Sequence, residues 1–146
     1  FVSQLFPMPD SIPPNADSVG RAMLAKRMTQ LADMHHAGVQ ILTGTDAPLR
    51  NSPPGFGLHE EMLMFTRGGL SPFEALRAAT LAPARYLGIA DSAGTVEAGK
   101  RADLILLDAN PLLDIRNTRR ITAVVFNGRL IDSTERAKLL RAAMDK

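Results

Sequence analysis

The sequence predicts an α/β fold for residues 1 to 90, followed by a small β unit over residues 91 to 146. Three observations predict it. A helical pattern that stops at Gly38 is followed at once by the short apolar run VQILT. This order of helix, glycine and strand is typical of an α/β unit. Three further helical segments come before Gly88. Beyond residue 94 the apolar period changes from helical to strand-like.

The first part of the chain alternates loop, helix and strand. Residues 1 to 16 hold four prolines, which exclude an interior helix or a central strand and predict an irregular loop. Asp17 can cap the helix that Gly38 ends, and apolar residues recur along it at helical spacing. Residues 39 to 43 are then predicted to form a short buried strand, and a helix follows over residues 58 to 67.

The clearest local signal is the segment LSPFEALRAATLAPARYLG. Ser71 is placed to cap a helix, Pro72 takes its first position, and Glu74 completes a capping box three residues after the serine. This pattern predicts a helix that runs to about Thr80 and a short second helix around residues 83 to 87.

The last part of the chain has the pattern of β structure. The segment GTVEAGKRADLILLD predicts two strands around a turn at Ala98-Gly99-Lys100. The segment ITAVVFNGRLID predicts a hairpin, because Asn127-Gly128 is well suited to a type I′ turn. A final helix is expected from about Ser133. Neither part of the chain is complete by itself, since one strand cannot close a sheet and two hairpins bury little.

The composition is that of a globular protein. The chain has 146 residues, 45% of them hydrophobic, and no run approaches the roughly 18 to 20 apolar residues that cross a bilayer. There is no cysteine, which excludes disulfides and thiolate metal sites. The chain starts at Phe1 without a charged n-region or cleavage-like site, so we expect a piece of a longer polypeptide.

The net charge of +2 is unevenly distributed. Residues 1 to 115 carry 9 basic and 12 acidic groups, whereas residues 116 to 146 carry 8 basic and 3 acidic groups. A basic tail can indicate nucleic-acid binding. The arginines of residues 116 to 146, however, fall where the faces of the predicted helix and hairpin should be exposed to water, so we expect no nucleic-acid partner.

Asp46 is the first candidate for chemistry. It stands about three residues past the predicted strand, in the segment ILTGTDAPLR. In α/β barrels, catalytic groups lie at the C-terminal ends of strands, where the loops converge on one pocket. The alternative is a turn aspartate, since Gly, Thr, Asp and Pro all favour loops. No phosphate loop, nucleophile elbow or dinucleotide fingerprint accompanies it.

The histidines offer little further metal chemistry. His59 follows the loop that leaves Asp46 and could contact substrate, or it could be a surface residue in the first turn of a helix. Of the two acids beside it, the first is expected to stabilise the helix N-terminus and the second, Glu61, stays undecided. His35 and His36 point about 100° apart and belong near the other end of the strand, so we do not expect them to be ligands.

Several motifs in order resemble a known family. The segments AGVQILTGTDAP, GLHEEM, GGLSPFEALRAATLAPARYLG, GTVEAGKRADLILLDANPLLDI and VVFNGRLI together resemble the C-terminal third of the amidohydrolase superfamily. The resemblance runs from about residue 20 to residue 132 and is closest to the imidazolonepropionase-like and prolidase-like members.

The resemblance implies a C-terminal fragment of a distorted TIM (β/α)8 barrel plus part of a small flanking β-sandwich. Residues 1 to 90 would be the end of the barrel, and residues 91 to 146 would belong to the sandwich and its terminal helix. Asp46 would bind a divalent metal, zinc in the first instance and one or two ions in the complete enzyme, and would shuttle a proton from the metal-activated water. His59 would lie near the substrate.

The chain also departs from the family pattern. The family's His-X-His after the first strand, its bridging carboxylate or carbamylated lysine, and its two single histidines on later strands have no counterpart in this sequence. A catalytic zinc takes three protein ligands, and this chain offers one well-placed carboxylate. The expected parent enzyme has roughly 400 residues, given a barrel of about 250, and the fragment alone is expected to be inactive.

The leading hypothesis is therefore a fragment of a metal-dependent hydrolase of C–N bonds in amides, peptides or cyclic amides. The expected partner is a small-molecule or dipeptide-like substrate, with no membrane partner, a cytoplasmic location, and homo-oligomer formation left open. One alternative is a truncated, non-catalytic interaction or dimerisation module, which exposed apolar area would discriminate. Another is a hydrolase of ester or C–halogen bonds on the same fold.

Overall fold

The computed structural model describes residues 16–47 and 55–144, in two compact units, Phe1–Ala79 and Thr80–Lys146. The predicted loop over residues 1 to 16 falls almost entirely outside the described residues. None of the helices in the described part of the chain is both long and apolar enough to cross a membrane.

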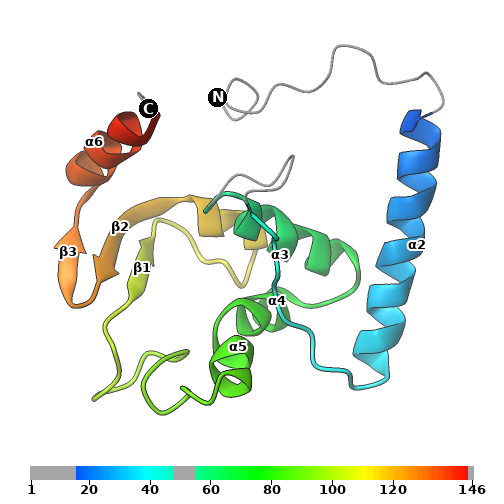
Figure 1. The fold of residues 1–146 in the computed structure, drawn as a ribbon, viewed down its shortest axis with the longest axis horizontal. Helices are drawn as coiled ribbons and strands as arrows, with labels where there is room; N and C mark the ends of the chain where they lie inside the picture. Colours follow the sequence, from blue (N-terminus) through cyan, green and yellow to red (C-terminus); the bar gives the residue numbers. More distant parts are fainter. Residues whose placement is uncertain (1–15, 48–54, 145–146) are drawn as a thin grey trace. The chain divides into compact units, whose positions relative to one another are not determined.

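The described part of the first unit contains three helices: α2 (Ala16–His36), α3 (Gly57–Arg67) and α4 (Pro72–Ala79) (Figure 1). The predicted helices in this part of the chain are confirmed. Helices α3 and α4 pack side by side around a small core. Its most buried apolar residues, all less than 9% exposed, are Met62, Phe65, Leu70, Ala75 and Ala78.

Gly68 lets α3 end where α2 approaches it. Its backbone N–H donates to the Met64 carbonyl and closes the last turn of α3. A Cβ at this position would lie 2.6 Å from Cδ2 of Leu31 on α2, which is closer than real Cβ atoms come. Gly68 therefore both ends α3 and leaves room for Leu31 of α2.

The predicted strand over residues 39 to 43 is wrong. Residues 39 to 46 have no regular secondary structure, and Val39 is 50% exposed. A strand requires a neighbour to accept and donate its backbone hydrogen bonds, and the described part of this unit contains no other strand. Instead, the backbone N–H of Thr43 donates to the Ala78 carbonyl at 3.0 Å.

The capping box of α4 is confirmed. The backbone N–H and the hydroxyl of Ser71 each donate to Oε2 of Glu74 at 2.7 Å, and the Glu74 N–H donates to Oγ of Ser71 at 3.3 Å. The two hydrogen bonds from Ser71 lower the pKa of Glu74, and His35, whose Nε2 lies 3.2 Å from Oε1, lowers it further. The ionised carboxylate is therefore the form that stabilises the helix start.

We expect Ser71→Ala to lower the free energy of unfolding at neutral pH by about 1 kcal/mol, because a helix cap is lost. Folding lowers the pKa of Glu74, so the extra stability of the wild type over Ser71→Ala is fully present above about pH 4 to 5, the ordinary range of a glutamic acid. This extra stability is lost as the pH falls through the lowered pKa of Glu74. Urea denaturation from pH 7 downward measures the difference.

Glu74→Gln is the matched control for this pH dependence, because glutamine keeps an acceptor for Ser71 but does not titrate. The difference in the free energy of unfolding between Glu74→Gln and the double variant Ser71→Ala/Glu74→Gln should not change over the same pH range. A Ser71→Ala effect of constant size down to pH values below the range of glutamic acids would contradict the linkage.

The second unit is a three-stranded antiparallel sheet with helices beside it (Figure 1). The strands lie in the order β1-β2-β3, so β2 is central. The elements are α5 (Leu81–Tyr86), β1 (Leu104–Leu107), the 3₁₀ helix η1 (Ile115–Arg119), β2 (Ile121–Phe126), β3 (Arg129–Ile131) and α6 (Ser133–Met144).

The predicted hairpin is confirmed between β2 and β3. Asn127 and Gly128 both have positive φ, 49° and 80°, as a type I′ turn requires. The Asn127 N–H donates to the Asp103 carboxylate at 2.7 Å, and the Gly128 N–H donates to the Ala102 carbonyl at 3.0 Å. The turn is thus held against the residues that lead into β1.

Only one of the two strands predicted around Gly99 forms. Residues 94 to 97 are irregular, whereas Leu104–Leu107 is the strand β1, so the first of the two predictions is wrong. The side chain of Lys100 bonds locally to Thr95 and Glu97, which holds a turn, and no described strand pairs with this segment. The 3₁₀ helix η1, capped by the Asp114 carboxylate through the Arg116 N–H, was not predicted.

Candidate functional site

The TGTD segment, residues 43 to 46, places Asp46 at an exposed position between α2 and α3 in the chain. The φ angle of Asp46 is 49°, in the left-handed region that few residues other than glycine adopt. Aspartate tolerates this conformation better than most residues, and such backbone strain concentrates at functional sites. The backbone outlier thus adds to the positional argument for Asp46.

Two helices hold the TGTD segment just before Asp46. The N–H and hydroxyl of Thr43 both point to the Ala78 carbonyl in the last turn of α4, at 3.0 and 3.4 Å. The N–H of Gly44 donates to Oε1 of Glu61 on α3 at 2.8 Å. Two consecutive residues of an otherwise irregular segment are therefore fixed to two different helices.

The side chain of Glu61 is half-buried and lies near Asp46. Burial raises the pKa of Glu61, the hydrogen bond from Gly44 lowers it, and the negative charge of Asp46 raises it again, with a net rise. Oε2 of Glu61 is buried and accepts no hydrogen bond from the described residues. The residue that the sequence left undecided thus belongs to the surroundings of Asp46.

His59 lies in the first turn of α3 and is half-buried. Residues two apart on a helix point to different faces, so His59 and Glu61 do not share a face. A substrate role for His59 stays a prediction. Glu60 is exposed in the same turn, where its charge is favourable at the helix N-terminus, as expected.

His35 and His36 lie at the C-terminal end of α2, with ring centroids 5.9 Å apart. Nε2 of His35 pairs with the carboxylate of Glu74 at 3.2 Å. Among residues 16–47 and 55–144, no three His, Asp or Glu side chains are grouped so that they could hold a metal ion. The carboxylate of Asp46 suits a divalent metal chemically, but the described residues supply at most part of such a site.

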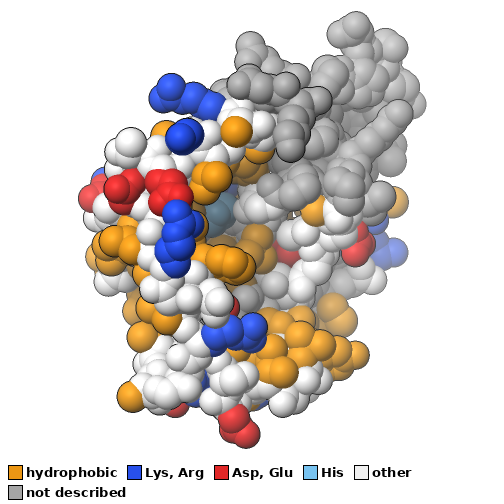
Figure 2. Space-filling model, turned by 60° about the vertical axis from the view of Figure 1, so that its left-hand side comes forward, with side chains coloured by type: hydrophobic (Ala, Val, Ile, Leu, Met, Phe, Trp, Pro, Cys, Tyr) orange, Lys and Arg blue, Asp and Glu red, His pale blue; other side chains and the backbone are white. Residues whose placement is uncertain are grey.

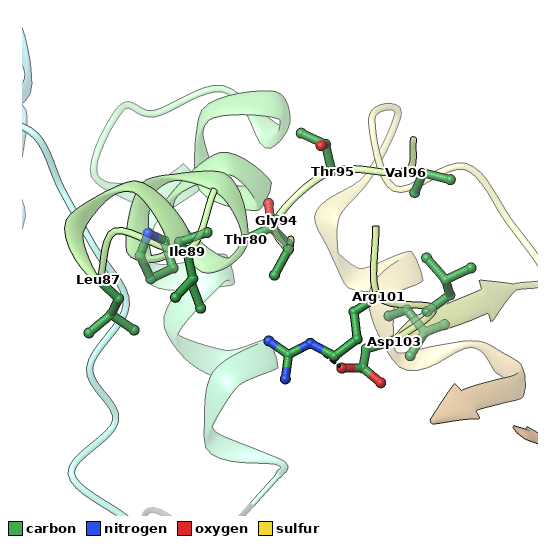
Figure 3. A pocket seen from close by; sticks show the side chains of 13 residues that line it. Thr80, Leu87, Ile89, Gly94, Thr95, Val96, Arg101 and Asp103 are labelled. Carbon is green, nitrogen blue, oxygen red and sulfur yellow. Dashed lines mark ion pairs between the residues drawn. The ribbon is translucent and has the colours of Figure 1, made fainter. Parts of the chain in front are cut away.

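The second unit contains a cavity of about 490 Å³ (Figure 3). Its walls are mostly apolar, with Leu87 and Ile89 on one side and Val96 on another. Arg101 and Asp103 lie side by side at this cavity and pair with each other, Nε to Oδ2 at 3.6 Å. The lining includes no histidine and no cysteine, and its charged side chains are the paired Arg101 and Asp103.

Large apolar side chains are exposed on the sheet of the second unit. Figure 2 shows hydrophobic side chains gathered at the surface. In β1, Ile105 is 50% exposed and Leu106 is 61% exposed, and successive strand residues point to opposite faces. Phe126 and Leu130 are 66% and 62% exposed. Both faces of the sheet are therefore only partly covered by the described residues.

The sequence predicts Asp46 as a site residue but does not predict what surrounds it. The contact between Gly44 and Glu61 joins residues 17 positions apart, and no local pattern signals it. The sequence offers one hint, the two adjacent acids in GLHEEM. The first acid, exposed in the first turn, is enough to stabilise the helix N-terminus. The second acid points to a different side of the helix and therefore has another role.

Known proteins resemble the chain over most of its length. The model of the amidohydrolase family matches residues 7–131. Ochratoxinase from Aspergillus niger is 35% identical over 116 residues, which cover 71% of this chain and 23% of that protein. Imidazolonepropionase from Thermoplasma volcanium is 33% identical over 109 residues, which cover 70% of this chain and 26% of that protein.

A solved structure is also similar. A Xaa-Pro dipeptidase with methionine bound in its active site matches with a TM-score of 0.68 and 29% identity, over 91% of this chain and 32% of that chain. The present chain spans about a quarter of the length of the two curated relatives. The match to the family model covers well over half of the chain and agrees with the motifs around Asp46. The chain therefore belongs to the amidohydrolase family, with relatives that include imidazolonepropionases and prolidase-like proteins.

Proposed function

We propose that this chain forms the C-terminal part of a metal-dependent hydrolase that cleaves a C–N bond in an amide, a peptide or a cyclic amide. The observation that carries the proposal is the exposed carboxylate of Asp46, at the end of a segment that two helices hold in place. Membership of the amidohydrolase family supports it. A cytoplasmic location is part of the proposal.

In this proposal, residues 1 to 90 complete a distorted (β/α)8 barrel and residues 91 to 146 complete a small β-sandwich. Two features support it. Residues 39 to 46 lack a strand partner among the described residues, as expected if the neighbouring strands lie elsewhere in the polypeptide. The apolar side chains of Ile105 and Leu106 on both faces of β1 also require cover.

Asp46 has two roles in the proposed reaction. One carboxylate oxygen would be a ligand of a divalent metal, most simply zinc, whose other ligands lie outside the described residues. When bound, the metal polarises the scissile carbonyl and lowers the pKa of water toward neutrality. The Asp46 carboxylate accepts a proton from water as the oxygen bonds to the carbonyl carbon, and then passes this proton to the leaving nitrogen as the C–N bond breaks.

The proposed substrates are small molecules or dipeptide-like compounds. The similar solved structure is a dipeptidase by name, which supports a substrate of this size. His59 is proposed to contact the substrate, because α3, in whose first turn it lies, begins shortly after Asp46 in the chain. The exposed apolar side chains of the sheet weigh against a self-sufficient module that works as a monomer, and leave a dimerisation module, which would bury them in a closed oligomer, as the alternative.

The test is metal content and hydrolysis, measured on the 146-residue chain and on the full-length polypeptide that carries it. Elemental analysis gives the metal content, and a panel of dipeptides and acyl-amino acids reports hydrolysis. We expect metal and turnover in the longer protein and neither in the 146-residue chain. Stoichiometric metal in the short chain would overturn the proposal that the other ligands lie elsewhere, and a full-length protein without hydrolytic activity on amides or peptides would overturn the function.

A further inference from the structure

We propose that Glu61 is a positioning residue that holds the backbone of Gly44 and so sets the place of the Asp46 carboxylate. The catalytic consequence of this inference rests on the proposed function of Asp46. The structural part, that Glu61 holds the TGTD segment, stands on the contacts of the described residues alone.

The contact itself is short and well placed. The Gly44 N–H donates to Oε1 of Glu61 at 2.8 Å, the distance of a hydrogen bond to an ionised carboxylate. Gly44 stands two residues before Asp46 in the chain. A displacement of the Gly44 peptide is therefore transmitted to Asp46 through a single intervening residue.

Glu61 comes from a part of α3 that is itself fixed. Its neighbour Met62 is 4% exposed, and Phe65, one turn further along the helix, is 8% exposed. These two side chains anchor α3 in the core of the first unit. A functional side chain is held most precisely by residues on a rigid element. Glu61 connects the irregular TGTD segment to such an element, the helix α3.

The segment needs this support because its other anchor lies further from Asp46. Thr43 is held by the Ala78 carbonyl, but Asp46 itself adopts a φ of 49° and is exposed. Without Glu61, the Gly44 N–H would lose its acceptor and the backbone between Thr43 and Asp46 would be free to relax. The unfavourable conformation of Asp46 would then have one support fewer.

The surroundings of Glu61 are unfavourable for a carboxylate. Oε2 of Glu61 is buried without a hydrogen bond from the described residues, and the like charge of Asp46 lies nearby. Burying an oxygen in this way is unfavourable, and two neighbouring carboxylates repel each other. The acceptor that holds the Gly44 N–H therefore comes at a cost to stability, which its hydrogen bond to the TGTD segment offsets only in part.

The first arm of the test measures hydrogen exchange of the Gly44 amide by NMR in the 146-residue chain. We expect Glu61→Ala to speed exchange about tenfold, because one hydrogen bond of ordinary strength is lost. Glu61→Gln should keep the amide protected, since glutamine also offers an oxygen acceptor. Glu60→Ala is the matched control, in the same turn of α3 but exposed, and it should not change exchange at Gly44.

The second arm measures kcat, KM and metal affinity in the full-length enzyme. We expect Glu61→Ala to lower kcat and metal affinity by about 10- to 100-fold, the usual effect of removing a group that orients a ligand. KM should stay nearly unchanged, Glu61→Gln should recover most of the loss, and Glu60→Ala should behave as wild type. A general loss of fold would lower the melting temperature and would not be recovered by glutamine.

The outcomes separate this inference from the proposed function. If Gly44 exchange is the same in wild type and Glu61→Ala, or if Glu60→Ala speeds it equally, the inference is overturned. If Asp46→Asn abolishes turnover while Glu61→Ala keeps normal kcat and metal affinity, the inference falls and the proposed function stands. If Asp46→Asn is fully active while Gly44 exchange responds to Glu61→Ala, the proposed role of Asp46 falls and the structural role of Glu61 stands.

Discussion

Replacing Asp46 by asparagine in the full-length polypeptide should lower the kcat of the proposed hydrolysis by about 10²- to 10⁴-fold, the contribution expected of a positioned general base. Asparagine has nearly the same shape as aspartate and also tolerates the left-handed backbone conformation found here. It cannot accept the proton from water, and it is a neutral and weaker metal ligand. Turnover and bound metal should therefore both fall while the fold persists.

Steady-state kinetics, elemental analysis and thermal unfolding of the same preparation measure these three quantities. Asp91→Asn is the matched control, because Asp91 is an exposed aspartate in a turn of the other unit. It should leave activity and metal content unchanged. Near-normal turnover in Asp46→Asn would contradict the catalytic role, and the TGTD segment would then be only a turn.

The largest expected effect on stability is that of Gly94→Ala. Gly94 has a φ of +94°, and a Cβ there would lie 2.7 Å from the Cβ of Ala84 and 3.1 Å from the Cα of Leu81. The positive φ costs about 1 to 2 kcal/mol for a residue with a Cβ, and forcing an atom into a packed site costs about 1 to 3 kcal/mol more. We expect a loss of about 3 kcal/mol in the free energy of unfolding of the second unit.

Gly99→Ala is the control that separates the two causes. Gly99 also has a positive φ, +87°, but a Cβ there would meet no atom within 4 Å. Its replacement should cost only the backbone term, about 1 to 2 kcal/mol. Urea titration with hydrogen exchange of the β2 amides as the readout assigns the loss to the second unit. Equal losses in the two variants would show that packing against Ala84 contributes nothing.

The elements that the sequence predicted correctly depend on contacts between near neighbours. The capping box of α4 needs only Ser71 and Glu74, three residues apart, and the hairpin turn needs only Asn127 and Gly128. Such contacts form wherever the segment is placed, because the interacting groups are brought together by the local backbone. The order of the motifs along the chain also resembles the family that the comparisons show.

The elements that the sequence predicted wrongly depend on distant partners. Residues 39 to 43 and residues 94 to 97 have strand-like patterns, but a strand exists only when a second strand accepts its backbone hydrogen bonds. Within the described residues, neither segment has such a neighbour. The pattern reflects the preference of these residues for strand conformation. Without a neighbouring strand among the described residues, that preference is not enough to form a strand.

The sequence by itself determined that Asp46 ends a TGTD segment in a chain of the amidohydrolase type. Only the tertiary structure decided that α3 supports this segment, through a hydrogen bond between Gly44 and Glu61 across 17 positions. No periodicity encodes that contact, because it depends on how α3 packs through Met62 and on where the irregular segment runs. The physical reason is that hydrogen bonds between distant residues are selected by packing, whereas caps and turns are selected by the local backbone.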